Sequence, residues 1–298
     1  MRRYWMSIIG VAALASAMSF GRTPDPDLSR AEGFYSRTDY GRAIDAVQSL
    51  DRRDAAVYSL VGKAFFLQGQ YKEAAANLEK AVAEDRLSSD SYDWLGKAYG
   101  RLAEGSSFLS ALGYAKKTVR SFERAVELGP SNLEALSDVF EYYLDAPAMV
   151  GGGVDKAENI AKRMSSLDEA EYHWMRARLA EKRKDYLAAE REFRAALAAA
   201  PDQVGRELDV AAFLSARGRF EESDAIFRGA AEKYPNTPKV LYAQASAYVQ
   251  SRRNLDQAES LLKRYLELQI TPDDPQRTEV AALLKSVRGS RSRIRQGE

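Results

Sequence analysis

The strongest constraint on this chain is a pattern that recurs along it. Three stretches, which begin at Tyr71, Tyr186 and Phe220, each carry an aromatic residue, a large apolar residue seven positions later and an alanine three positions after that. Pro201 and Pro235 follow the last two stretches and are 34 residues apart. A fixed period of this size indicates an array in which one small structural unit is stacked on copies of itself.

The segment before each stretch also repeats, and its spacing predicts a helix. Apolar residues at i, i+3 and i+7 lie on one face of a 3.6-residue helix. Small residues recur where the partner helix would cross closely: Gly62, Gly96, Ala177, Ala211 and Ala245. Gly69 and Gly218 suit turns that need left-handed backbone, and proline ends the second helix at Pro130, Pro201 and Pro235. The sequence therefore predicts antiparallel helix pairs.

At these positions the sequence resembles the tetratricopeptide repeat family, over nearly the whole chain beyond its first twenty or so residues. The resemblance implies an all-α, right-handed solenoid over residues 24–272 with about seven repeats, near 24–54, 55–88, 89–131, 132–169, 170–203, 204–237 and 238–272. A capping helix is expected over 273–288 and a disordered tail over 289–298. Two repeats carry extra residues, near 105–115 and 146–154. The stretch around the second is similar to a variant repeat of exported bacterial tetratricopeptide proteins.

The N-terminus has the order of a secretory signal peptide. Arg2 and Arg3 precede an uncharged stretch over 4–21, which contains the small-residue triplet 15–17. We expect cleavage after Ala17 and a periplasmic or secreted protein. The alternative is an uncleaved anchor in the inner membrane, because 18 uncharged residues lie at the lower limit for a spanning helix.

The amino-acid composition argues against most kinds of catalytic and metal-binding site. The chain has no cysteine and one histidine, His173, so cysteine chemistry is excluded and a histidine metal centre is not expected. Basic residues (44) balance acidic ones (43), which gives no signal for nucleic acid. The glycine triplet 151–153 lacks the lysine of a phosphate loop and predicts an elongated turn. We therefore expect no catalytic residue, cofactor or metal, and no enzymatic activity.

The resemblance implies that a partner binds on the concave face formed by the first helix of each repeat. Mapping the inner positions onto this sequence predicts a partner-binding set of Lys63, Phe66, Lys97, Arg101, Phe140, Tyr143, Trp174, Arg178, Lys182 and Tyr242. Aromatic anchors beside basic donors suit a protein or peptide ligand with apolar and acidic residues. The alternative is that the aromatic side chains pack on neighbouring helices and leave no open groove.

These features predict a non-catalytic protein- or peptide-binding scaffold. The alternative is a membrane-anchored assembly subunit of an envelope or secretion complex, which the uncharged N-terminal stretch would tether. No membrane contact is expected beyond that anchor.

Overall fold

The computed structural model describes residues 26–48, 50 and 53–296. The expected signal peptide, residues 1–17, lies outside the described residues. Within the described ranges the chain forms fifteen α-helices and one short 3-10 helix, η1 (Ala148–Val150), with no strand. The fold is all-α, as predicted.

The helices come in pairs, and each predicted repeat range contains one pair. We call the first helix of a pair helix A and the second helix B. The A helices are α1 (Pro26–Ser36), α3 (Ala55–Leu67), α5 (Ser89–Glu104), α7 (Leu133–Asp145), α9 (Glu169–Lys182), α11 (Val204–Ala216) and α13 (Pro238–Gln250). The B helices are α2 (Tyr40–Gln48), α4 (Tyr71–Glu84), α6 (Phe108–Leu128), α8 (Val154–Met164), α10 (Tyr186–Ala199), α12 (Phe220–Lys233) and α14 (Leu255–Glu267).

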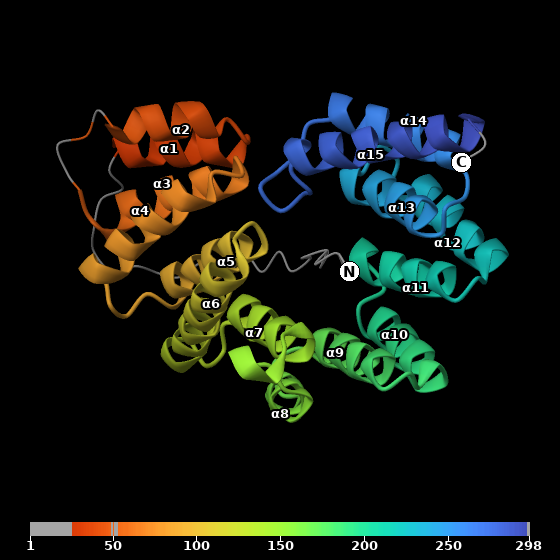
Figure 1. The fold of residues 1–298 in the computed structure, drawn as a ribbon, viewed down its shortest axis with the longest axis horizontal. Coiled ribbons are helices and arrows are strands. Elements are labelled where there is room, and N and C mark those ends of the chain that lie inside the picture. The colour runs from red at the N-terminus through yellow and green to blue at the C-terminus, as the bar shows by residue number, and fades with distance from the viewer. Residues whose placement is uncertain (1–25, 49, 51–52, 297–298) are drawn as a thin grey trace. The chain divides into compact units, whose positions relative to one another are not determined.

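The chain divides into two compact units. The described part of the N-terminal unit lies between residues 26 and 185 and contains α1 to α9 (Figure 1). The described part of the C-terminal unit comprises residues 186–296 and contains α10 to α15. The fifth predicted repeat, residues 170–203, is shared between the units, because α9 belongs to one and α10 to the other.

Close crossing of helices A and B explains the small residues in the N-terminal unit. A Cβ atom on Gly62 would lie 2.6 Å from Leu78 Cγ, and one on Gly96 would lie 2.5 Å from Phe122 Cδ1. Both distances are far below van der Waals contact, so any larger residue would push the paired helices apart. The predicted reason for glycine at these positions is confirmed.

The two sequence inserts pack together in the N-terminal unit. The first insert lengthens α6 to 21 residues, and the second forms η1 and the glycine turn. The Tyr142 hydroxyl lies between the carbonyl oxygens of Ala115 and Val150, at 2.8 and 2.7 Å. Gly151 has φ 100°, and a Cβ on Gly152 would lie 1.8 Å from the Ala146 carbonyl oxygen, so the triplet is the elongated turn that was predicted.

The C-terminal unit ends in a longer helix than predicted. Its core gathers buried side chains of α13 and α14 with Val280 and Val287 of α15 (Arg277–Gln296). The sequence predicted a cap that ends at residue 288 and a disordered tail, but α15 continues to Gln296. The segment after residue 288 contains one glycine before the helix ends and no proline, and a single glycine weakens a helix by only about 1 kcal/mol without ending it.

Candidate functional site

Four of the five predicted basic residues of the N-terminal unit lie where neighbouring A helices meet. Helices α3, α5, α7 and α9 contact one another in that order. Lys63 of α3 pairs with Asp90 of α5, with Nζ 2.6 Å from Oδ2. Cations and carboxylates make most of the polar contacts along this line. We call them the charged seam: Lys63, Asp90, Asp93, Lys97, Glu134, Asp138, Glu141, Asp145, Glu171, Arg178 and Lys182.

Lys97 occupies the centre of the seam. Its Nζ lies 3.1 Å from Asp93 Oδ2 and 3.0 Å from Asp138 Oδ2, and it also contacts Glu134 Oε1. Burial alone would lower the pKa of Lys97, but the three carboxylates outweigh it and raise this pKa well above its usual value. Lys97 is therefore a fixed positive charge that joins α5 to α7.

The carboxylates around Lys97 carry more negative charge than one ammonium group balances. Burial raises the pKa of Asp93 well above its ordinary value, and repulsion from Asp138 and Glu134 raises it further against the attraction of Lys97. The pKa of Asp138 is raised for the same reasons, burial first and then Glu134.

This carboxylate group also has the spacing of a metal site. Oxygens of Asp93, Glu134 and Asp138 lie within 4.8 Å of one another. The Lys97 ammonium stands among them and supplies the positive charge that a metal ion would bring. We assign the group to the seam and not to a metal.

A second set of ion pairs joins α7 to α9. Arg178 Nη1 lies 2.9 Å from Glu141 Oε1, and Lys182 Nζ lies 3.2 Å from Asp145 Oδ1. The Ser137 hydroxyl of α7 donates to Glu171 Oε1 of α9 at 2.8 Å. The same type of contact thus recurs at successive A-helix junctions.

The predicted aromatic anchors are not exposed, which corrects that part of the sequence interpretation. Phe140, Tyr143, Trp174 and Tyr242 are all buried, with Phe140 fully inaccessible. The Phe140 and Trp174 rings pack across the α7–α9 junction with centroids 6.1 Å apart. Tyr143 donates to Glu123 of α6 and Tyr242 packs on Tyr265 of α14. These side chains build the helix packing, as the alternative interpretation stated.

The remaining predicted residues are partly exposed and already engaged. Phe66 packs edge-on against Trp94, with ring centroids 5.4 Å apart. Arg101 donates from Nε to the Tyr71 hydroxyl at 3.1 Å and lies over its ring. Nine of the ten predicted residues belong to the N-terminal unit and Tyr242 to the C-terminal unit.

Sequence reasoning placed Asp90, Asp93 and Glu171 on the inner face but did not select any acidic residue for the partner-binding set. It selected the cations, because one of the inner positions of the family register is basic in three repeats, at Lys63, Lys97 and Arg178. Helix α7 supplies the missed signal, because Glu134, Asp138, Glu141 and Asp145 recur at intervals of four, three and four residues. That spacing places them on one face of a helix.

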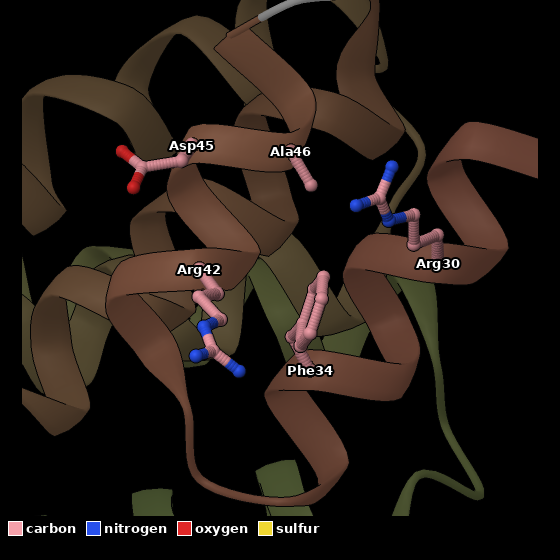
Figure 2. Close-up of a pocket in the computed structure, with 5 residues that line it drawn as sticks. All are labelled: Arg30, Phe34, Arg42, Asp45 and Ala46. Atoms are coloured by element: carbon pink, nitrogen blue, oxygen red, sulfur yellow. The ribbon is translucent and has the colours of Figure 1, made fainter.

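A shallow pocket lies between α1 and α2. It has a volume of about 470 Å³ and is lined by Arg30, Phe34, Arg42, Asp45 and Ala46. Figure 2 shows Arg30 and Arg42 on either side of Phe34, with Asp45 pointing away from the ring. The guanidinium carbons of these arginines lie 5.7 and 5.9 Å from the ring centroid. The lining presents cation–aromatic stacking, with no carboxylate turned toward the ring for acid–base chemistry.

Comparisons with known proteins identify the repeat. A family model described as tetratricopeptide repeat matches residues 152–204 and 214–275, and a second model of the same description matches residues 55–86. A thermophilic TPR protein of Thermus thermophilus is similar in structure, with TM-score 0.52, 20% identity, and coverage of 63% of this chain and 97% of that chain. No curated protein matches the chain in sequence.

Two further solved structures share the fold. A tetratricopeptide repeat protein from Parabacteroides merdae has TM-score 0.58 and 14% identity, with 88% of this chain and 97% of that chain covered. A human IFIT1 dimer with PPP-AAAA has TM-score 0.54 and 16% identity, with 80% and 54% covered. At these identities the likeness shows the fold alone.

The stacked helix pairs and these neighbours define an α-solenoid repeat protein. The stretches that the family models match, residues 55–86, 152–204 and 214–275, are tetratricopeptide repeats. Proteins with this fold generally act as scaffolds for protein interaction, not as catalysts.

Proposed function

We propose that this protein is a non-catalytic scaffold that binds a protein or peptide through its A helices. The observation that carries the proposal is the succession of α3, α5, α7 and α9, which places side chains of four repeats along one surface of the N-terminal unit. Repeats stacked in this way provide an extended binding surface, because each repeat adds its own residues to the same face.

The structure changes the ligand chemistry that this proposal favours. The sequence suggested an apolar and acidic ligand, on the expectation of free basic residues and exposed aromatic rings. The rings are buried, and Lys63, Lys97 and Arg178 each contact carboxylates of the chain itself. An acidic ligand would have to displace those carboxylates, so it is no longer the favoured partner.

Export is part of the proposal and rests on the N-terminal sequence. We infer a signal peptide over residues 1–17, with release into the periplasm or medium. Among the helices that the structure describes, none combines the length and the apolarity needed to cross a bilayer. The alternative, a subunit of an envelope or secretion complex held by an uncleaved leader, rests on the uncharged stretch over residues 4–21.

Site-specific photo-crosslinking in the native cells tests the binding surface. Benzoylphenylalanine at position 63 or 182 would report on the A helices, and at position 80 or 162 on helix B of the same unit. We expect a recurrent adduct from the first two positions and none from the second two. Adducts only from helix B would overturn the proposal. Mass spectrometry of the protein also shows whether its N-terminus begins at Met18.

A further inference from the structure

Charge is segregated between the two helix sets of the N-terminal unit. Helices α3, α5, α7 and α9 together contain ten carboxylates and six lysines or arginines. Helices α4, α6 and α8 have the opposite bias, with seven carboxylates and nine lysines or arginines. The whole chain is close to neutral, so the excess of carboxylates is a local property of these A helices.

We propose that the charged seam docks a cationic segment of a partner protein, one rich in lysine or arginine. This inference rests on the proposed function, because it names the partner chemistry of the same surface. The seam contains seven carboxylates and four cations. Even without Asp93 and Asp138, whose pKa values are raised, five carboxylates remain beside four cations, so the seam keeps an excess of negative charge. A cationic segment supplies the missing charge.

The centre of the seam has unused hydrogen-bond acceptors. Lys97 has three N–H donors for three carboxylates, whereas each ionised carboxylate has about four acceptor sites. Asp93 has an exposed side-chain fraction of only 2%, and its Oδ1 is buried and accepts no hydrogen bond from the described residues. A buried acceptor without a donor costs about 1–3 kcal/mol, so the carboxylates at the centre of the seam are not fully satisfied by Lys97.

The rim of the seam is open to solvent. Asp90 and Glu134 have side-chain exposures of 52% and 43%, the largest among the seam carboxylates whose ion pairs join neighbouring A helices. Their partners Lys63 and Lys97 both lie over the Trp94 ring, with Nζ 5.4 and 4.6 Å from its centroid. The two exposed carboxylates thus belong to one neighbourhood around Trp94. A guanidinium or ammonium group can reach them first and then approach the buried carboxylates.

The physical advantage of such a surface is selection of the partner. Exposed carboxylates attract cationic segments from a distance and repel acidic ones, which raises the association rate and excludes wrong partners. The seam's four cations cancel part of this attraction, and the carboxylates in excess of them supply what remains. Binding is therefore expected to weaken as salt screens the charges.

Fluorescence anisotropy with two labelled peptides tests the inference on the full chain. The probes are an alternating Lys-Ala peptide and the matching Glu-Ala peptide, measured at about 50 and about 200 mM NaCl. We expect the Lys-Ala peptide alone to bind, more weakly at the higher salt. The double variant Asp90→Asn/Glu134→Gln should bind it about tenfold more weakly or worse.

The matched control removes the same charge from helix B. Glu73→Gln/Glu84→Gln changes two exposed carboxylates of α4 in the same unit and should bind like the unchanged protein. Equal losses in both double variants, no loss in either, or tighter binding of the Glu-Ala peptide would each overturn the inference. If Asp90→Asn/Glu134→Gln lowers the helical circular dichroism, Asp90→Asn alone replaces it.

Failure of the inference differs from failure of the proposed function. If neither peptide binds, while crosslinks from positions 63 and 182 still identify a partner, the cationic chemistry is wrong and the scaffold function stands. If those crosslinks are absent as well, both are wrong.

Discussion

The two units use the same repeat but join their A helices in different ways. In the N-terminal unit, α5 meets α7 through Lys97 and the carboxylates around it. In the C-terminal unit, α11 and α13 contact each other, and their buried residues include Leu208, Val240 and Ala243. These two helices together carry only two acidic and two basic residues. The repeat therefore fixes how A crosses B, whereas the contact between successive A helices is free to be charged or apolar.

Ion pairs in the C-terminal unit lie elsewhere. Arg253, in the turn after α13, contacts both oxygens of Asp224 on α12 at 2.7 and 2.8 Å. This pair stabilises a helix junction and leaves little net charge on it. By contrast, the pairing in the charged seam leaves acceptors unused. The difference indicates that the excess of carboxylates in the N-terminal unit is not required by the repeat.

The largest expected effect tests the apolar core that α11, α12 and α13 share in the C-terminal unit. Phe227 of α12 is fully buried beside Leu208 and Ala230. We expect Phe227→Ala to lower the free energy of unfolding by about 3–5 kcal/mol, because the cavity loses both transfer energy and packing. Urea unfolding followed by circular dichroism measures this loss. The loss should be the same at pH 5 and pH 8, and a strong pH dependence would show that charge also holds this junction.

Lys97→Met tests the charged contact between the A helices α5 and α7. Removing the ammonium leaves buried carboxylates uncompensated, so we expect a loss of about 2–4 kcal/mol near neutral pH. The loss should shrink toward pH 4, where protons neutralise the carboxylates. Trp94 and Trp174 are in the N-terminal unit and residues 186–298 contain no tryptophan, so fluorescence in a Trp5→Phe background reports on this unit. An equal loss at both pH values would mean that Lys97 acts by packing and not by charge.

The sequence predicted the helix pairs because their signals are local. Gly62, Gly96 and Pro130 act on their own turn or crossing, and each has the role that its residue type predicts. The exposure of Phe140 and Trp174 was predicted wrongly, because it depends on the angle between successive A helices, which no local pattern encodes. The seam depended on contacts some 37 residues apart, such as Lys97 with Glu134, so the sequence showed its cations without their partners.

Two aspartates should respond to pH in opposite directions. The hydrogen bonds from Arg253 lower the pKa of Asp224 against the effect of burial, whereas burial raises the pKa of Asp93. Asp224 therefore stabilises the fold above its unfolded pKa, and this contribution is lost as pH falls through the folded pKa. Asp93 has the opposite effect. It holds its proton more tightly in the folded protein than in the unfolded chain, so its contribution to stability falls as pH rises.

Substitution of each aspartate by asparagine measures how its contribution to the free energy of unfolding changes with pH. Asp224→Asn should cost about 1–2 kcal/mol near neutral pH and less as the pH falls below 4, because a partly buried charged hydrogen bond is lost. Asp93→Asn should become more stable relative to the unchanged protein as pH rises from 4 to 7. Urea unfolding at several pH values gives both trends. Parallel slopes for the two variants would contradict the opposite environments assigned to these carboxylates.

The smallest expected effect decides how far burial extends along the seam. Lys63 and Asp90, like Lys97 and Asp138, form an ion pair between neighbouring A helices, but their side chains are 21% and 52% exposed, against 9% and 16%. Water screens the exposed pair, so Lys63→Met should cost less than about 1 kcal/mol by tryptophan-monitored unfolding. A loss as large as that of Lys97→Met would mean that the rim is as closed as the centre. The surface would then have no open edge at which a cationic partner could begin to bind.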